Sequence, residues 1–240
     1  MKVAISFIGT NRYLNFLPKY YENIEKYFLP KSEKTILAFT DGELNETPEN
    51  IKVFSQEHLD WPYITLKRFE IINKAREIIS DHDWFVFIDA DALVVDQIDE
   101  DEFFTDKPLF GVHHPCHFLK MRPHSEYPGA WDQNQKSLAY VNTIEEKPQI
   151  YYQGCFWGGQ VPQVCAMIDE LQSRIDQDLE KDIIALWHDE SHINRYFLDN
   201  KEMVHTFGPE YSFPELFKEY CNFERKIVHL AKNNSEYHVG

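Results

Sequence analysis

The sequence predicts an α/β protein with a parallel-centred sheet. Apolar, β-branched segments lie at residues 2–9, 34–42 and 84–96, and segments with helical spacing separate them. Strands and helices that alternate in this way form βαβ units, whose strands pair in parallel. We find no internal repeat, linker or low-complexity tract in the 240 residues, which predicts a single domain.

The first strand and helix are predicted at the start of the chain. Residues 2–9 (KVAISFIG) are apolar and end in glycine, as in a buried strand. Residues 12–28 carry aromatic side chains at roughly helical spacing. Proline fits the start of a helix but kinks its interior, so Pro18 is expected near a first turn or at a kink.

Two further strands and a long helix are predicted next. Residues 34–42 close on an Asp-Gly turn signal, and residues 51–56 predict a third strand. Pro62 fits the first turn of a helix that is expected to end near Ser80. The apolar side chains of this helix recur at three- and four-residue steps and form one stripe: Phe69, Ile72, Ala75, Ile78 and Ile79.

The later elements follow a less regular pattern. Residues 84–96 (WFVFIDADALVVD) are expected to form one central strand. Residues 111–135 are rich in His, Pro and aromatic side chains and predict loops. Residues 151–171 (YYQGCFWGGQVPQVCAMIDEL) resemble a strand, a glycine turn and a helix.

The net charge of −16, from 40 acidic and 24 basic residues, narrows the possible partners. A nucleic-acid binder normally presents a basic stripe, and an anionic membrane surface attracts basic segments. We therefore expect neither partner. An acidic protein that binds a phosphate group requires a metal ion or a local cluster of Lys and Arg.

Cysteine usage and the lack of long apolar stretches predict a soluble cytoplasmic protein. The four cysteines are widely spaced and form no CxxC pair, which argues against a structural zinc site and against a disulfide scaffold. The first apolar run is too short for a signal peptide. No apolar stretch reaches the length of about 18 residues that predicts a membrane span.

Two aspartates follow the apolar part of the predicted central strand. Ligands of open α/β sheets collect at the carboxyl ends of strands, where Asp89 and Asp91 lie. Carboxylate oxygens suit hard cations such as Mg²⁺ and Mn²⁺. The pair also fits a solvated strand end. It fits a haloacid-dehalogenase phosphatase less well, because Leu93 replaces the usual Thr or Val and the motif follows roughly the fourth strand.

The segment WHDESHIN fits a metal site, a catalytic carboxylate or the solvent-exposed face of an ordinary helix. His188 and His192 at i and i+4 would share a helix face, but Asp189 replaces the glutamate of zinc peptidases and no third ligand is nearby. Trp187 beside two acids favours a carboxylate held in a pocket, because a buried carboxylate is costly unless it is paired or used. Asp189 or Glu190 is therefore a catalytic candidate.

Several separated segments, taken together, closely resemble the family 6 glycosyltransferases, which include the blood-group A and B transferases and the α-1,3-galactosyltransferase. WHDESHIN and the pattern YYxGxxxGG are specific, whereas Asp-Ala-Asp alone is not. The similarity extends from about Val3 to Tyr237. The segments occur in the order WPYITLKRF (61–69), FIDADALVV (87–95), HP (114–115), YYQGCFWGG (151–159), WHDESHINRYFLDN (187–200) and GPEYSFPE (208–215).

The resemblance implies a GT-A fold in one domain over residues 1–240. A Rossmann-like UDP-binding half (about 1–110) is fused to an acceptor-binding and catalytic half (about 111–240). It implies retaining transfer of galactose or N-acetylgalactosamine from a UDP-sugar to a galactose-containing glycan, typically α-1,3-linked, by a soluble bacterial-type or viral member. A dehalogenase-like phosphohydrolase and a non-catalytic sugar-binding module are the alternatives.

The resemblance also assigns residues to the donor. Asp89 and Asp91 match the family's DxD motif, which binds Mn²⁺ and the diphosphate, so dependence on Mn²⁺ or Mg²⁺ is expected. Gln153, Gly154 and Cys155 match positions that distinguish galactose from N-acetylgalactosamine. The other predicted nucleotide and donor contacts are Ile8, Gly9, Thr10, Tyr13, Arg68, Ala90, Asp189 and Lys232.

On the acceptor side, His114, Trp187 and Glu190 match acceptor-site positions. Glu190 also matches the candidate nucleophile, a carboxylate that forms a covalent glycosyl-enzyme or stabilises an oxocarbenium-like state. The chain departs from the family pattern after the His-Pro pair and in YPGAWDQNQ, which leaves the acceptor open. Cys155 is larger than the glycine of N-acetylgalactosamine users, which favours galactose.

Overall fold

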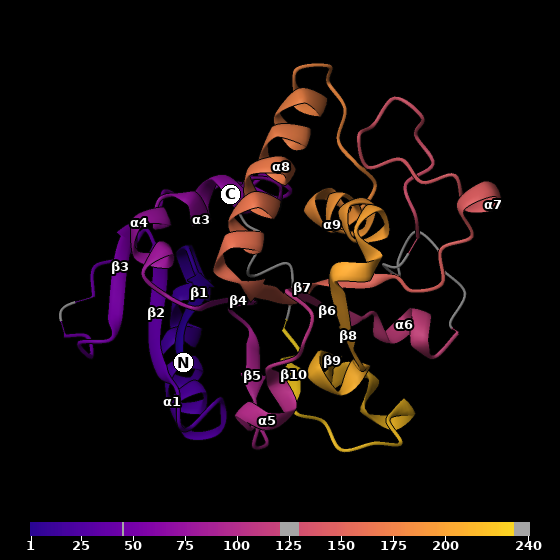
Figure 1. Ribbon diagram of the computed structural model, residues 1–240. Helices are drawn as coiled ribbons and strands as arrows, with labels where there is room; N and C mark the ends of the chain where they lie inside the picture. Colours follow the sequence, from indigo (N-terminus) through magenta and orange to yellow (C-terminus); the bar gives the residue numbers. More distant parts are fainter. Residues whose placement is uncertain (45, 121–129, 233–240) are drawn as a thin grey trace.

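The computed structural model describes residues 1–44, 46–120 and 130–232 and is built on a seven-stranded mixed sheet (Figure 1). The predicted α/β class is confirmed. Strands from both predicted halves of the chain belong to this one sheet. Its strands, in spatial order, are β3 (Ile51–Ser55), β2 (Glu33–Thr40), β1 (Lys2–Ile8), β4 (Trp84–Ile88), β7 (Tyr152–Gln160), β6 (Leu109–His113) and β8 (Val204–Phe207).

The first four strands pair in parallel, as predicted from the alternation of strands and helices. β1 pairs in parallel with β2 on one side and with β4 on the other, and β2 pairs in parallel with β3. The second part of the sheet changes direction, because β7 runs antiparallel to both β4 and β6. The carboxyl ends of β1 and β4 therefore lie beside the beginning of β7.

The two faces of the sheet bury different sets of side chains. Side chains alternate across a strand, so Val3, Ile5 and Phe7 of β1 pack in one core and Ala4 packs in the other. α1 (Leu17–Tyr27) covers the first face, and α8 (Val161–Leu179) covers the second (Figure 1).

Shorter elements complete the fold. α9 (His188–Asp199) packs beside α8 and against β7. A second sheet has the order β5-β10-β9 and lies on the same side as α1 (Figure 1). Its strands are β5 (Ala92–Val94), β10 (Ile227–His229) and β9 (Phe213–Pro214). The remaining helices are α2 (Tyr63–Leu66), α3 (Arg68–Asn73), α4 (Arg76–Ser80), α5 (Glu100–Phe103), α6 (Pro115–Phe118) and α7 (Thr143–Glu146). The 3₁₀ helices are Asn11–Phe16, Lys201–Met203, Pro209–Tyr211 and Glu215–Tyr220.

Two of the predicted helices are less regular than expected. The segment predicted over 12–28 begins as a 3₁₀ helix, and α1 starts only at Leu17, with Pro18 in its first turn as predicted. The helix predicted after Pro62 is divided into α2, α3 and α4, because the backbone leaves the helical region at Lys67 and Ala75. Its apolar stripe nevertheless packs in the core as predicted, with Ile78 partly buried.

The prediction of one central strand over residues 84–96 is wrong. β4 ends at Ile88, and β5 belongs to the second sheet. Between them the chain turns at Asp89-Ala90-Asp91, where the backbone N–H of Ala92 donates to the carbonyl of Asp89 at 3.0 Å. The apolar residues on both sides of the turn are buried, so hydrophobicity alone does not distinguish two short strands from one long strand.

The predicted glycine turn is also wrong, because Gly158 and Gly159 lie inside β7. A Cβ atom on Gly158 would overlap the carbonyl oxygen of Phe85 on the neighbouring strand β4. A Cβ on Gly159 would overlap the carbonyl oxygen of Pro108, and its φ of 154° also disfavours a side chain. These glycines therefore allow close backbone approach within the sheet.

Replacing Gly158 with Ala is expected to lower the free energy of unfolding by about 1–3 kcal/mol, because backbone atoms of two strands must separate. Urea denaturation measures this change. Gly208→Ala is the matched control, since a Cβ there would meet only the carboxylate of the Glu210 side chain, which can rotate away. Equal stability of Gly158→Ala and the wild type would contradict the assigned packing.

Candidate active site

A cavity of about 240 Å³ opens at the carboxyl ends of β1 and β4. This is the edge at which ligands of open α/β sheets are expected. The structure brings most of the predicted nucleotide contacts together in its wall: Ile8, Thr10, Tyr13, Arg68, Asp89, Ala90, Asp91 and Lys232. It adds residues that the sequence analysis did not identify: His58, Leu59, Trp61, Ile64, Thr65 and Phe87.

A second cavity of about 220 Å³ adjoins the first. The two share Trp61, Thr65, Arg68 and Asp89, so Arg68 and Asp89 stand at their junction. The residues that belong only to the second cavity come from β7 and from the start of α9: Gly154, Cys155, Trp187, His188, Asp189 and Glu190.

Arg68, at the start of α3, holds this junction together. Its Nη1 donates to the carbonyl oxygen of Gly154 at 2.6 Å and lies 2.7 Å from Oδ2 of Asp189. Its Nη2 lies 3.4 Å from Oδ1 of Asp89, and the guanidinium covers the ring of Phe87 at 4.2 Å. Arg68 is only 7% exposed, so one buried cation fixes the positions of two carboxylates from different parts of the chain.

The carboxylate of Glu190 points toward the backbone of β7. Its Oε2 accepts a hydrogen bond from the backbone N–H of Gly154 at 2.8 Å. Burial raises the pKa of Glu190 to about 8, against the opposing effects of the Gly154 N–H and the Tyr151 hydroxyl. The carboxyl group of Glu190 therefore changes its charge at a pH slightly above neutral.

The neighbouring carboxylate, Asp189, forms an ion pair with the guanidinium of Arg68. Burial raises its pKa to about 6, and the ion pair with Arg68 opposes this increase. Asn194 fixes the helix that carries both acids, because its side-chain amide exchanges two hydrogen bonds of 2.7 Å with the backbone of Tyr152. α9 is therefore tied to β7 beside Gly154.

The second aspartate of the Asp-Ala-Asp turn is already paired. Asp91 is 6% exposed and forms an ion pair with Lys232, and its Oδ1 lies 3.9 Å from Nδ1 of His229. Burial raises the pKa of Asp91, but His229 and Lys232 outweigh this effect and hold it well below its usual range. Asp89 is the more accessible of the two, with its side chain 24% exposed.

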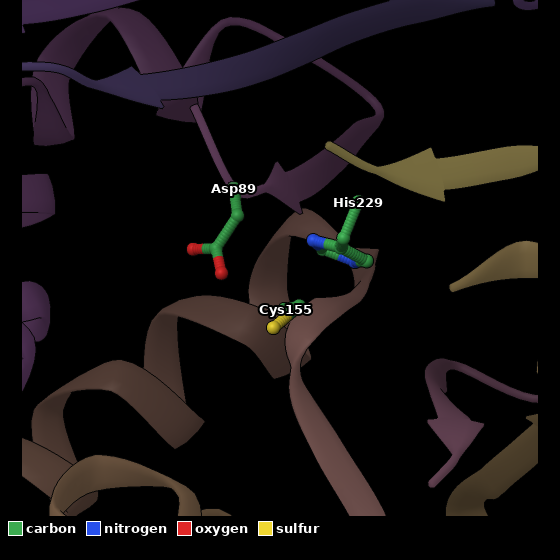
Figure 2. Close-up of side chains that lie close together, drawn as sticks. All are labelled: Asp89, Cys155 and His229. Atoms are coloured by element: carbon green, nitrogen blue, oxygen red, sulfur yellow. The ribbon is translucent and has the colours of Figure 1, made fainter. Parts of the chain in front are cut away.

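Asp89 faces two further potential ligand atoms. Among the described residues, Asp89, Cys155 and His229 form a group whose ligand atoms all lie within 4.8 Å of one another. Figure 2 shows a ring nitrogen of His229 and the sulfur of Cys155 directed into the space beside the Asp89 carboxylate. The three residues come from the end of β4, from β7 and from β10.

The histidines of WHDESHIN do not form a common site. His188 and His192 both belong to α9, but His188 is its first residue, with a φ of 51°, and the two rings contact different neighbours. The ring of His188 packs edge-on against Trp61 at 4.6 Å. His192 is buried with Nε2 at 3.6 Å from Oδ2 of Asp178, a structural contact between α9 and α8.

Three predicted site residues lie outside the walls of both cavities. Gly9 is buried, between Ile8 and Thr10 of the first cavity wall in sequence. Gln153 is 9% exposed, and its Oε1 accepts a hydrogen bond from Ser212 at 2.7 Å. His114 is 2% exposed, and burial lowers its pKa to about 3. Their assigned contacts remain predictions, and part of the loop that departs from the family pattern falls on residues 121–129, outside the described residues.

Comparison with known proteins identifies a family whose model matches nearly the whole chain. The model of glycosyltransferase family 6 matches residues 1–239. The O-antigen biosynthesis glycosyltransferase WbnI of Escherichia coli is 31% identical, over 99% of this chain and 98% of its own length. Histo-blood group ABO system transferase 2 of Rattus norvegicus is 24% identical, over 95% and 68% of the two chains. Globoside alpha-1,3-N-acetylgalactosaminyltransferase 1 of Homo sapiens is also 24% identical, over 88% and 60%.

Proposed function

This chain belongs to glycosyltransferase family 6, and on that premise we propose that it is a retaining hexosyltransferase that uses a UDP-sugar donor. The family resemblance predicted from the motifs is thereby confirmed, and the mixed α/β sheet agrees with a GT-A fold. The phosphohydrolase and the non-catalytic sugar-binding module are not favoured. Within the described residues, no helix has the length and apolarity needed to cross a membrane.

The observation that carries the proposal is the pair of adjoining cavities with Arg68 and Asp89 at their junction. The first cavity has apolar and aromatic side chains in its wall that suit a nucleoside, and Lys232 and Arg68 supply positive charge in the same wall. The second cavity holds Glu190 and Trp187, a carboxylate and an aromatic ring that suit a sugar. A sugar–diphosphate bond placed at the junction would leave the sugar beside Glu190.

Glu190 is the residue that we propose acts on the donor sugar. An ionised carboxylate near the anomeric carbon stabilises the developing oxocarbenium charge or forms a bond to that carbon. The Gly154 N–H fixes one carboxylate oxygen at 2.8 Å, and the two hydrogen bonds between the Asn194 side chain and the backbone of Tyr152 fix the helix that carries Glu190. Trp187, which precedes Asp189 and Glu190 in sequence and also lines the second cavity, is proposed to contact the acceptor.

The charges of the site fit a divalent metal ion. Three carboxylates (Asp89, Asp91 and Asp189) face two cationic side chains, Arg68 and Lys232, so a diphosphate would add further uncompensated negative charge. We propose that Asp89 and Asp91 hold Mn²⁺ or Mg²⁺ when the donor binds. The ion would supply Lewis-acid stabilisation of the leaving diphosphate. Lys232, which now pairs with Asp91, is proposed to contact the diphosphate.

We further propose that the donor is UDP-galactose and that the product is an α-1,3-linked galactoside. Cys155 lines the second cavity together with Gly154 and Glu190, and we propose that its side chain occupies space that a glycine would leave for an N-acetyl group. A donor competition assay tests this: UDP-galactose is expected to be used at least about tenfold better, and Cys155→Gly is expected to reduce that preference. Equal use of both donors by the wild type would contradict it.

Release of UDP from each UDP-sugar, with and without a lactose-type acceptor, tests the transferase itself. We expect UDP release that depends on the acceptor and falls about a hundredfold or more when EDTA removes the metal, because a metal contributes several kcal/mol to such a transition state. Restored activity with added Mn²⁺ is the control. Unchanged activity in EDTA would refute the metal, and no turnover of any UDP-sugar would refute the donor class.

A further inference from the structure

We propose that Asp89, Cys155 and His229 form a binding site for a zinc-class divalent cation, and that this site binds the cation in the free protein, without nucleotide. Their ligand atoms all lie within 4.8 Å of one another, and the side chains converge from the turn after β4, from β7 and from β10 (Figure 2). Thiolate and imidazole ligands favour Zn²⁺ and Co²⁺ over Mn²⁺ and Mg²⁺. This set therefore differs in chemistry from a pair of carboxylates.

The hydrogen bonds of His229 leave one ring nitrogen available for a cation. The hydroxyl of Ser212 donates its only proton to Oε1 of Gln153 at 2.7 Å. The same oxygen lies 2.7 Å from Nε2 of His229 and, in the tautomer protonated at Nε2, accepts that proton. In the neutral ring, Nδ1 then carries a lone pair. A partner that holds one imidazole N–H and frees the other nitrogen is the usual arrangement around a metal-binding histidine.

The surroundings of that nitrogen also favour a cation. Nδ1 of His229 lies 3.9 Å from Oδ1 of Asp91, so a second carboxylate lies near the proposed ligand atoms. The carboxylate of Asp89 lies on the same side, within 4.8 Å of the His229 and Cys155 ligand atoms. A cation among these groups would be attracted by the carboxylates of Asp89 and Asp91, the second of which also pairs with Lys232.

The distances require only small side-chain movements. In a tetrahedral zinc site with bonds of about 2.0–2.3 Å, ligand atoms are about 3.3–3.6 Å apart, so the three atoms need to approach one another by no more than roughly 1.5 Å. The thiol of Cys155 would release its proton to solvent and bind as thiolate. Three protein ligands leave a fourth position open.

Titration of the nucleotide-free protein with Co²⁺ tests the site, because a cobalt–thiolate bond gives an intense near-ultraviolet charge-transfer band. We expect the band in the wild type, its loss in Cys155→Ser, and strong weakening in His229→Gln. Cys165→Ser is the matched control, since Cys165 lies on α8 and is absent from the ligand group, and this variant should keep the band. Circular dichroism verifies that each variant is folded.

Competition by Zn²⁺ and Mn²⁺ supplies a second measurement. Zn²⁺ is expected to displace Co²⁺ at a concentration at least about tenfold below that needed for Mn²⁺. The absence of a band in the wild type, or its persistence in folded Cys155→Ser, would overturn the proposal. These outcomes are independent of the proposed transferase activity, because binding is measured without a donor, and loss of UDP release with an intact cobalt band would count only against the proposed function.

Discussion

Replacing Glu190 with Gln is expected to lower the rate of sugar transfer by about a thousandfold while leaving the affinity for UDP within a few-fold of the wild type. The amide keeps the shape of the side chain and accepts the hydrogen bond from the Gly154 N–H, but it provides no negative charge for an oxocarbenium-like state. Steady-state UDP release measures the rate, and calorimetry measures nucleotide affinity. Transfer near the wild-type rate would remove Glu190 from the chemistry.

The same substitution is expected to stabilise the protein. Because the pKa of Glu190 is raised to about 8, the folded state holds a proton that the unfolded chain releases above about pH 4.3. The free energy of unfolding therefore falls as pH rises from about 4 to about 8. Glu190→Gln removes this dependence and is expected to gain a few kcal/mol at pH 8. Glu77→Gln, an exposed change on α4, is the control and should gain nothing.

The raised pKa also predicts how activity depends on pH. Glu190 must be ionised to act on the donor sugar, so kcat/KM for the UDP-sugar should rise with pH through a limb near 8 in the free enzyme. A profile of kcat/KM measured between about pH 5.5 and 9.5 shows the limb. If the limb persisted unchanged in the residual activity of Glu190→Gln, another group would be responsible for it.

Replacing Arg68 with Met is expected to destabilise the protein by about 3–5 kcal/mol and to abolish donor use. The substitution leaves Asp189 buried without its ion pair at 2.7 Å and removes the donor to the Gly154 carbonyl. Urea denaturation and UDP calorimetry measure the two effects. Donor use is expected to be lost because Arg68 lies at the junction of the two cavities and holds Asp89 and Asp189 there.

Two comparisons isolate the contribution of the buried charge. Arg76→Met removes a partner of Asp169, whose side chain is 63% exposed, and a pair at the surface is expected to contribute at most about 1 kcal/mol. Adding Asp189→Asn to Arg68→Met should recover part of the lost stability, because it removes the unpaired carboxylate. If Arg68→Met were no less stable than Arg76→Met, the central role of Arg68 would be wrong.

The elements that the sequence predicted well are those in which local pattern and burial agree. β1, β2 and β3 were found near their predicted positions, and the apolar stripe after Pro62 is packed in the core. The sequence also indicated the acidic site residues, because Asp89 and Asp91 follow an apolar strand and Glu190 lies three residues after Trp187. Their assignment to a donor site nevertheless depended on the family resemblance.

The features that the sequence did not predict arise from contacts between distant segments. Nothing near Arg68 in sequence indicates that it binds the Gly154 carbonyl and two aspartates, since these partners lie 21 to 121 positions away. The proximity of His229 to Asp89 likewise depends on the pairing of β10 with β5. Gly158 and Gly159 were mistaken for a turn because close packing of neighbouring strands leaves no local sequence signal.

β7 has a further consequence for how sugar preference can diversify. At Gly158 and Gly159 the strand is paired on both sides, by β4 and β6, and a Cβ atom on either glycine would overlap a backbone carbonyl oxygen. Cys155 lies instead at a register shift, where the pairing with β6 skips residues 154–156. On the proposed assignment of Cys155 to the donor sugar, a substitution at this position is expected to change the preferred hexose and leave the paired part of β7 unchanged.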